Sequence, residues 1–325
     1  MATDLSALID HLACPECTGG LVAENRELRC VACDRRYPVI DDVPRLLPDA
    51  LPEPLSRTAD AFGWQWQHFI EMYDAYEAQF LDWIAPIAPE FFREKDVLDA
   101  GCGIGRHAFF ADRYGARSVT ALDLSAAVET ARRNLAESPS AHVVQGDLLQ
   151  PPLRRPANGG GFDFIYSIGV LHHLPEPRSG FLELARLLRP GGTIAVWVYG
   201  YEHNELVRHV IEPIRRFTTR LSPTALRAVA APLGVLFYAV VKLVYGPASR
   251  RGRADRLPLG EYIASLSAFN FRQIYNIVFD QLVAPTAAYI RGEELRSWFE
   301  DAGLTEIEIG SRHGNSWRGR GRAPE

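Results

Sequence analysis

The sequence lacks the features that would predict a membrane crossing or export. No stretch among its 325 residues reaches the roughly 18 uncharged apolar residues expected of a membrane-spanning helix; the nearest, residues 228–241, has 14. No basic region followed by a long apolar run is present near residue 1, so no signal peptide is predicted. Cysteine is scarce, with 5 residues, and without an export signal we expect these thiols to stay reduced in a cytoplasmic compartment.

An excess of positive charge is also absent. The formal net charge is −5, which excludes a global electrostatic attraction to nucleic acid or anionic lipid. The exception is local, because residues 208–256 hold ten basic residues and only two acidic ones, Glu212 and Asp255. With 47% apolar and 23% charged residues, most of the chain is expected to fold, as one large domain or two ordinary ones.

Turn formers and hydrophobic periodicity divide the chain into segments. Residues 1–48 are cysteine-paired and rich in turn formers, and 49–58 form a proline-rich linker. Residues 59–200 and 271–312 alternate strand and helix patterns, which predicts a parallel α/β sheet. Residues 201–270 are mostly helical and basic, so we expect a helical cap insertion, whereas 313–325 show no periodicity and are expected to form a tail without regular structure. The predicted strands are 96–99, 118–123, 141–145, 162–168, 193–198 and 305–309, and the predicted helices include 126–136, 179–188 and 292–302.

Four of the five cysteines form two CxxC pairs. Cys14 and Cys17 are separated by twelve residues from Cys30 and Cys33, a spacing that can place four thiolates around one Zn²⁺. A segment this short buries little apolar surface, and metal binding would supply the missing folding free energy. Four thiolate ligands leave no open position for water, so the zinc would be structural. The alternative of two redox pairs remains open.

The N-terminal segment resembles a known family of small proteins. The run CVACDRRYPVIDDVPRLLP is similar to zinc-ribbon proteins related to the activator subunit of tRNA and protein methyltransferases. The resemblance covers roughly 45 residues. Here the ribbon is joined to a larger domain in one chain, so a separate partner is not implied.

A glycine-rich run follows the first strand of the α/β region. In VLDAGCGIGRH (97–107) a strand ends near Asp99, and Gly101, Gly103 and Gly105 form a turn that enters a helix. Glycine permits unusual backbone dihedrals and close approach of a ligand. The DxGxGxG pattern resembles class I S-adenosylmethionine-dependent methyltransferases. The resemblance implies a Rossmann-like, doubly wound, mostly parallel seven-stranded sheet, and a loop that contacts the methionine part of S-adenosylmethionine, ordered by the acid at Asp99.

Further motifs follow in the order of that family. Asp123 closes the second strand, 18 residues after Gly105, where an acid can accept both ribose hydroxyl protons. The resemblance places Asp147, after the third strand, against the adenine amine, and FDFIYSIGVLHHLPEP (162–177) and LLRPGGTIAVWVYG (187–200) resemble the fourth-strand and fifth-strand motifs. We expect the cofactor site to be completed by Leu124, Gly146, Leu148, Ser167, Trp64 and Trp66.

The resemblance implies transfer of the cofactor's methyl group to an O, N or C nucleophile of a small molecule, which leaves S-adenosylhomocysteine. His172 and His173 follow the fourth strand and titrate near neutral pH, so either is a candidate proton acceptor, and Tyr76 is a further catalytic candidate. The alternative is that one or both histidines only pack near the cofactor. Cys102 lies inside the glycine loop and is interpreted as a small packing residue, because no base is paired with it in sequence.

Two other segments have a structural and a functional interpretation. The aromatic segment 59–84 has rings at helical spacing, which indicates either a core-facing stripe or a lid whose ring faces stabilise the sulfonium cation. In the cap, Tyr199, Tyr201 and Asn204 are candidates to point inward, as are Asp280, Gln281 and Tyr289 further along. The basic cap is either a solvated helical face, a site for an anionic substrate, or a contact with lipid through residues 228–241.

Competing functions stay open at this stage. A tRNA or rRNA base methyltransferase would use the zinc ribbon and the basic cap to bind phosphate, although the net charge is negative. A nicotinamide dehydrogenase shares the glycines but does not need the HHLP and RPGG elements. A non-catalytic binding module does not need Asp99, Asp123 and Asp147. The sequence leaves a homo-oligomer open and does not name the methyl acceptor.

Overall fold

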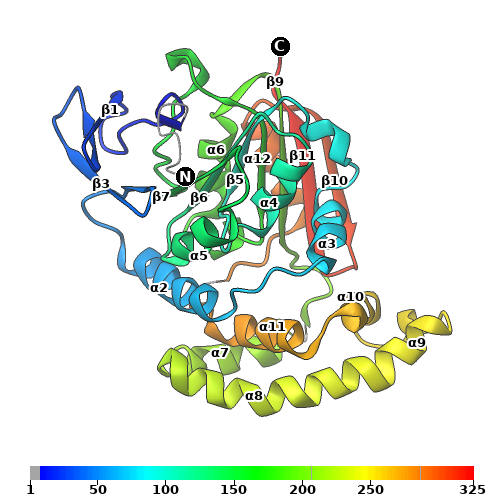
Figure 1. Cartoon of the computed structure of the whole chain (residues 1–325). Coiled ribbons are helices and arrows are strands. Elements are labelled where there is room, and N and C mark those ends of the chain that lie inside the picture. Colours follow the sequence, from blue (N-terminus) through cyan, green and yellow to red (C-terminus); the bar gives the residue numbers. More distant parts are fainter. Residues whose placement is uncertain (1–7, 206, 286) are drawn as a thin grey trace.

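One mixed sheet runs through the whole molecule. The computed structural model describes residues 8–205, 207–285 and 287–325. Within them, eleven strands lie in the order β1-β2-β3-β4-β7-β6-β5-β8-β9-β11-β10 (Figure 1). The strands are β1 Leu21–Glu24, β2 Glu27–Cys30, β3 Arg36–Ile40, β4 Val43–Leu46, β5 Asp96–Ala100, β6 Ser118–Asp123, β7 Ala141–Gly146, β8 Phe162–Ile168, β9 Leu188–Tyr199, β10 Thr305–Arg312 and β11 Ser316–Arg322.

The last seven strands of that order form the expected Rossmann-like sheet. Strands β7, β6, β5, β8 and β9 pair in parallel, and β11 and β10 pair antiparallel at the edge. The chain adds β6 and β7 on one side of β5 and then returns to add β8 and β9 on the other. The order therefore reverses between β5 and β8, at the kind of switch point where doubly wound sheets bind ligands. The prediction of a Rossmann-like, mostly parallel sheet is confirmed, but the sheet has eleven strands instead of seven because the N-terminal ribbon extends it.

Both faces of the sheet are covered because successive residues of its strands point to opposite sides. Val97, Val119 and Phe164 pack on one face, against α3 to α5, whereas their neighbours Leu98 and Ile165 pack on the other, against α6 and α12. These helices are α3 Ala75–Ile84, α4 Arg106–Arg113, α5 Ala127–Asn134, α6 Pro177–Ala185 and α12 Gly292–Asp301.

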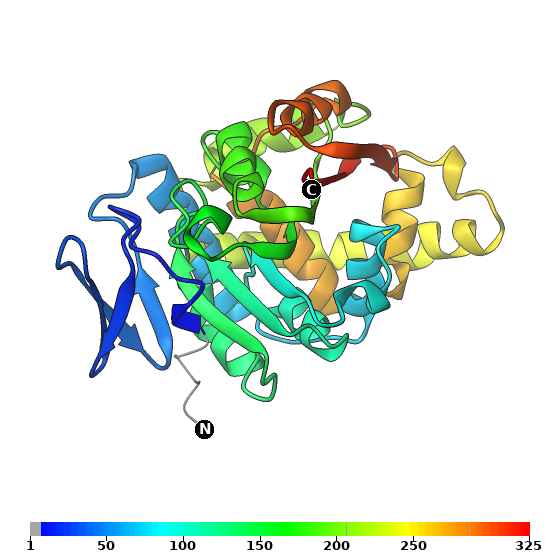
Figure 2. The ribbon, with the colours of Figure 1, turned by 90° about the horizontal axis from the view of Figure 1, so that it is seen from above.

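The ribbon is part of the same sheet. Strand β4 pairs in parallel with β7, with Arg45 opposite Gln145 and Leu46 opposite Gly146. The ribbon also contacts the segment after β7, where the Ala13 N–H donates to the Pro152 carbonyl at 3.0 Å. The N-terminal unit is therefore fixed to the edge of the larger domain (Figure 2).

A layer of helices covers the carboxyl ends of the strands. It contains α2 Glu53–His68, α7 Glu212–Thr218, α8 Pro223–Val240, α9 Gly246–Arg250, α10 Gly260–Ser265 and α11 Phe271–Val283 (Figure 1). A π-helical turn, η5 Val241–Tyr245, joins α8 to α9, so Pro223–Arg250 is one helix of 28 residues. By length and composition this helix is apolar enough to cross a membrane. The predicted apolar run was shorter and ended before Lys242, but Lys242 lies within the helix and does not end it.

Three boundaries differ from the sequence analysis. Helix α2 begins at Glu53, inside the expected linker, because Pro52 and Pro54 lie at a helix start, where proline is tolerated. Residues 271–312 were predicted to belong to the sheet domain. Their first part, helix α11, packs on α8 and Phe69 and therefore belongs to the cap. The predicted irregular tail contains strand β11. In this strand Gly319 and Gly321 face inward and lie directly against the Phe299 ring, and the arginines that alternate with them face the other side. An apolar period of two is absent there because glycines occupy the inner positions.

Candidate functional site

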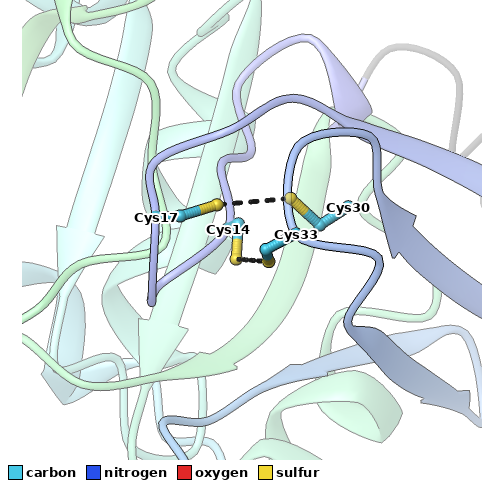
Figure 3. Close-up of side chains that lie close together, drawn as sticks. All are labelled: Cys14, Cys17, Cys30 and Cys33. Atoms are coloured by element: carbon cyan, nitrogen blue, oxygen red, sulfur yellow. Dashed lines mark hydrogen bonds between the residues drawn. The ribbon is translucent and has the colours of Figure 1, made fainter.

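The four paired cysteines converge on one point. Their sulfur atoms all lie within 4.8 Å of one another, with Cys17 and Cys30 at 3.4 Å and Cys14 and Cys33 at 3.7 Å (Figure 3). Tetrahedral zinc, with Zn–S bonds of about 2.3 Å, needs sulfur atoms about 3.8 Å apart. The donor set and its spacing therefore fit a structural Zn²⁺.

Backbone turns and one side chain shape this metal site. After each CxxC pair the next residue, Thr18 or Asp34, has a positive φ, and its N–H donates back to the first cysteine's carbonyl. The Tyr37 hydroxyl lies 3.1 Å from the Cys14 sulfur, where it can donate to the thiolate. Such second-shell donors orient metal ligands.

The glycine loop after β5 has the conformation that its sequence predicts. Gly101, Gly103 and Gly105 have φ values of 92°, 53° and 80°. A Cβ on Gly101 would lie 2.3 Å from the Val170 side chain, so only glycine fits there. At Gly103 the nearest side chain is the Trp66 ring, 3.5 Å from such a Cβ, so this turn faces a space with an aromatic wall.

Two acids at strand ends face the same space. Asp123 accepts the Gly103 N–H at 2.8 Å through one carboxylate oxygen, and the Ser125 N–H and hydroxyl at 2.8 and 2.7 Å through the other. Asp147, just after β7, accepts the Leu149 N–H at 2.9 Å. Burial raises the pKa of both carboxyl groups because it disfavours their charged forms. A hydrogen-bond donor on a ligand would stabilise each carboxylate in its ionised form.

These groups line a cavity of about 690 Å³ between the carboxyl ends of the strands and the helical cap. The volume lies in the upper part of the range for small-molecule sites, about 300–1,000 Å³. One end is polar and contains the glycine loop and the two acids, whereas the other end is built mostly from aliphatic and aromatic residues of the cap. A nucleoside-sized ligand at the polar end would leave the remaining space for a second reactant.

The structure divides the predicted cofactor residues into two groups. The wall of the cavity contains Gly101, Gly103, Asp123, Leu124, Asp147, Leu148 and Trp66. The others lie behind the wall: Asp99, Gly105, Gly146 and Ser167 are buried, and Trp64 stacks on His68 at 3.8 Å. The Ser167 hydroxyl donates to the Ala100 carbonyl at 2.9 Å, which joins the ends of β8 and β5.

Asp99 is the most unusual of the buried acids. Its side chain is 1% exposed, and neither carboxylate oxygen has a partner with hydrogen-bond geometry. Burial raises the pKa of Asp99 to about 8, the nearby Tyr166 hydroxyl lowers it in part, and the negative charge of Asp123 raises it further. A cationic ligand near the loop would stabilise the ionised form of Asp99.

The middle of the cavity contains a polar cluster from β9 and α11. The Tyr199 hydroxyl donates to Asp280 at 3.3 Å and accepts from the Gln281 amide at 3.2 Å. The Gln65 amide donates to the other Asp280 oxygen at 3.1 Å. Burial and the charge of Asp280 raise the pKa of Tyr199 well above its usual value, so this phenol stays protonated and remains a donor. Tyr199, Asp280, Gln281, Asn204 and Tyr289 all line the cavity, whereas Tyr201 does not.

The two histidines of the fourth-strand motif have different surroundings. His173 lines the cavity beside Phe62, with ring centroids 4.8 Å apart. His172 is fully buried and does not line it; its ring stacks on Tyr199 at 3.9 Å, and its Nδ1 accepts the Tyr199 N–H at 3.4 Å. Burial lowers the pKa of His172 well below its usual value, so the ring stays neutral. His172 therefore positions Tyr199, and His173 is the histidine that can meet a ligand.

The aromatic segment contributes to both the core and the cavity. Phe62, Trp66, Tyr76 and Trp83 line the cavity, whereas Phe69 and Phe80 are buried in core clusters. Burial raises the pKa of Tyr76, so its hydroxyl stays protonated. The core-facing stripe and the aromatic wall are thus two faces of the same segment.

Sequence reasoning missed Arg106 as a site residue. Its guanidinium lies on the cavity wall, 5.6, 5.0 and 5.6 Å from the ring centroids of Trp66, Tyr76 and Trp83. The only sequence signal was its place directly after Gly105. A permanent cation beside the loop is suited to hold a carboxylate.

Comparison with known proteins agrees with this geometry. Residues 98–196 match the family model described as a methyltransferase domain, and residues 6–42 match the model of Trm112p-like protein. The chain is 38% identical over 117 residues to a ubiquinone biosynthesis O-methyltransferase from Erwinia tasmaniensis, covering 35% of this chain and 46% of that one. It is 37% identical over 116 residues to a tRNA U34 carboxymethyltransferase from Methylococcus capsulatus, covering 35% of this chain and 33% of that one.

A solved complex of the Haloferax volcanii Trm112 methyltransferase activator and its methyltransferase is similar at 16% identity, with a TM-score of 0.46, covering 82% of this chain and 96% of that one. A likeness of this degree carries no information on function. The matched regions span 39–58% of the length of four curated relatives.

The fold and the site together define a Rossmann-like domain with a partly polar cavity at the carboxyl ends of its strands. The chain carries a methyltransferase domain behind an N-terminal Trm112p-like domain. The resemblance seen in the cysteine pairs and in the glycine loop is confirmed for both.

The metal site generates the first prediction. We expect about one zinc per chain in the purified protein, and its loss in Cys30→Ser, because the remaining three thiolates leave the tetrahedron incomplete. The melting temperature should fall by about 10 °C or more, since each kcal/mol lost is worth about 2–4 °C in a domain of 150–250 residues. Metal analysis and calorimetry measure both.

Cys102→Ser is the matched control, because Cys102 lies in the glycine loop, away from the four paired cysteines. It should keep its zinc. Wild-type protein that contains no zinc when prepared without chelator would contradict the assignment.

The second prediction concerns Asp99 and pH. Its pKa rises from 3.8 to about 8 on folding, so between these values the unfolded chain releases a proton that the folded chain keeps. The contribution of Asp99 to the free energy of unfolding therefore falls as pH rises through this interval, by at most about 1.4 kcal/mol per pH unit for one proton, and levels off above it. In Asp99→Asn this contribution is absent, and the fall should be shallower when urea unfolding is measured across the interval.

Asp123 and Asp147 keep their own raised pKa values in this variant, so part of the slope remains. Asp301→Asn, at a half-exposed side chain, should keep the full slope. An unchanged slope in Asp99→Asn would show that this carboxyl group is ionised in the folded protein.

Proposed function

We propose that this chain transfers a methyl group from S-adenosylmethionine to a small-molecule acceptor and releases S-adenosylhomocysteine. One observation carries the proposal: the glycine loop, Asp123 and Asp147 line one end of a cavity whose other end continues into the cap. The matched methyltransferase domain and the small-molecule substrate class in the name of the Erwinia tasmaniensis relative support it.

The residues at the polar end suit each part of the cofactor. Asp123 accepts one hydrogen bond through Oδ2 and two through Oδ1, so Oδ2 keeps a lone pair that can accept from a ribose hydroxyl. Asp147 is available to an adenine amine between the apolar side chains of Leu124 and Leu148. Arg106 is placed for the methionine carboxylate, and the ring faces of Trp66 and Tyr76 can stabilise a sulfonium cation.

S-adenosylmethionine, when bound, supplies an electrophilic methyl carbon on sulfur. The protein aligns the acceptor in line with the carbon–sulfur bond and takes a proton from an O or N nucleophile. The new bond joins the acceptor atom to the methyl carbon, and the electron pair of the broken bond stays on sulfur.

Asp280 is the proton acceptor that the geometry favours. It lies in the middle of the cavity, and the Tyr199 hydroxyl and the Gln65 amide fix its orientation. His173 lines the same wall and is the second candidate. His172 assists only through Tyr199, because its own ring is buried behind it.

The alternative acceptor is an RNA base. The tRNA substrate class in the name of the Methylococcus capsulatus relative and the exposed arginines of the cap favour it. The cavity argues for a small molecule, since the walls beyond the polar cluster are mostly apolar and offer no cation to a phosphate backbone, apart from Arg312, which pairs with Asp82.

Cofactor binding is the first test. Calorimetric titration should show that S-adenosylmethionine binds the wild type, and that Asp123→Ala binds it at least about tenfold more weakly, because a hydrogen bond to a charged group contributes about 1.5–3 kcal/mol. Asp123→Asn keeps the size of the side chain and should also bind weakly. Asp301→Ala is the control for loss of an acid elsewhere and should bind as the wild type does.

Equal affinity in wild type and both Asp123 variants would refute the ribose assignment. A wild type that binds neither the methyl donor nor S-adenosylhomocysteine, but does bind a nicotinamide dinucleotide, would refute the proposed function.

The second test locates the acceptor and the base. Methyl-radiolabelled S-adenosylmethionine is incubated with the protein and either a total organic-soluble extract or total RNA; label should enter the organic-soluble fraction. Asp280→Asn should then transfer label about a hundredfold more slowly or worse, the lower end of what general-base catalysis contributes, with unchanged cofactor affinity.

Label that enters RNA instead would show that the acceptor is an RNA base and not a small molecule. Turnover in Asp280→Asn equal to that of the wild type would return the role of base to His173, which His173→Gln then tests.

A further inference from the structure

The longest helix of the cap exposes an apolar face. Only 22% of the apolar window of Pro223–Arg250 is buried, and the helix forms an outer edge of the molecule (Figure 1). Its outward side chains are between 45% and 75% exposed: Val229, Leu233, Val235, Leu236, Leu243 and Val244. Ile214 and Phe217 of α7 continue this surface, and Phe217 is 70% exposed. We call these eight residues the apolar cap face. Water-exposed apolar patches of this kind mark interaction sites.

The opposite side of the helix is bound to the protein. Leu226, Ala230 and Gly234 recur at helical spacing and are buried in the cap. Gly234 lies against Tyr275 of α11, where an added Cβ would be 3.0 Å from the ring, and the Tyr275 hydroxyl donates to the Arg227 carbonyl at 2.6 Å. A helix held in this way along one side lies on a surface and does not cross a bilayer, because crossing would break its packing on α11.

Arginines flank the apolar cap face at both ends. Arg216 and Arg220 precede α8, Arg250 is the last residue of α9, and Arg251 and Arg253 follow it; all five are exposed. In the described part of the chain none of them forms an ion pair with an acid. Apolar side chains between unpaired cations match the interface of an anionic membrane, where the chains enter the acyl boundary and the cations meet the headgroups.

The cavity reaches this face. Leu233, Leu236 and Ile214 line the cavity and are also 45%, 64% and 44% exposed, so they form part of its mouth. Behind them the wall continues with Ile211, Val240 and Ile263 to the Tyr199–Asp280 cluster. An apolar chain can therefore extend from the face inward to the reacting centre without leaving an apolar surface.

We propose that the apolar cap face docks on an anionic membrane surface, and that the acceptor is an amphipathic lipid which enters the cavity from that surface. Its apolar chain occupies the cap end of the cavity, and its nucleophilic head reaches Asp280. The docking part stands on the cap alone, whereas the identity of the occupant as methyl acceptor rests on the proposed function.

A second copy of the chain fits this surface less well. In a two-fold pairing of antiparallel helices, Arg216 and Arg220 of one copy would face Arg250 and Arg251 of the other. Like charges brought together across an interface oppose association.

The experiment measures binding to vesicles by flotation, with the full chain. The wild type should bind vesicles of phosphatidylcholine and phosphatidylglycerol at low salt and bind phosphatidylcholine alone more weakly. Val235→Glu with Leu243→Glu should weaken binding about a hundredfold or more, since two exposed apolar side chains lose their insertion and neither residue lines the cavity. Arg250→Gln with Arg251→Gln should weaken binding to the anionic vesicles roughly thirtyfold, at about 1 kcal/mol per cation.

Ile40→Glu is the matched control, because Ile40 is 49% exposed on the ribbon, outside the cap. It should bind as the wild type does. Wild type that stays unbound, or a Val235→Glu/Leu243→Glu variant that binds equally well, overturns the docking proposal. Protein that resists extraction by alkaline carbonate would also overturn it, because that result indicates a membrane-spanning helix. A concentration-dependent dimer in light scattering that becomes monomeric in the same double variant would overturn it as well.

Two further measurements separate this proposal from the proposed function. The Val235→Glu/Leu243→Glu variant should keep the rise in melting temperature that S-adenosylmethionine causes. If the wild type binds vesicles but shows no such rise, the proposed methyltransferase function is refuted and the docking proposal stands. With the organic-soluble extract incorporated in the anionic vesicles, the variant should transfer label at least tenfold more slowly, and detergent should remove the difference. Equal rates from vesicles would overturn entry from the membrane.

Discussion

The hydrogen bond from the Gly103 N–H to the Asp123 carboxylate holds together the two loops that form the polar end of the cavity. It joins the end of β6 to the turn after β5, and the second Asp123 oxygen binds Ser125 at the start of the following helix. The carboxylate is buried, so its charge depends on these donors, and burial already raises its pKa. Two other groups at this end lie next to the pair: Trp66 faces Gly103, and Arg106 follows the loop.

Much of the fold and the polar end of the site could be predicted because local rules determine them. The strands 118–123 and 162–168 are buried apolar runs of a parallel sheet, and the structure has them with the same bounds. Parallel strands end at one edge, which brings Asp123 and Asp147 to one cavity although 23 residues separate them. The cysteine pairs needed only their spacing, since each CxxC forms its own turn.

The remaining features depend on contacts that no local pattern encodes. The short turn η3 Leu171–His173 directs neighbouring histidines to different places, His173 onto the cavity wall and His172 behind Tyr199. Arg106 becomes a site residue only when α2 and α3 bring three rings around it. An apolar stripe has the same period whether it faces the core or the solvent, so the sequence could not show that one side of α8 is exposed.

The ribbon also supports Asp147, an acid of the cavity wall that lies far from it in the sequence. Strand β4 pairs with Gln145 and Gly146, the two residues before Asp147, and residues 11–13 bind the segment after it through the Pro152 carbonyl and the Arg154 N–H. The stretch that carries Asp147 is therefore held by the ribbon at both ends. Four thiolates around one metal make that support rigid without contributing an atom to the cavity. Because β4 and residues 11–13 hydrogen-bond to the chain on both sides of Asp147, disorder of the ribbon would act directly on this part of the cavity wall.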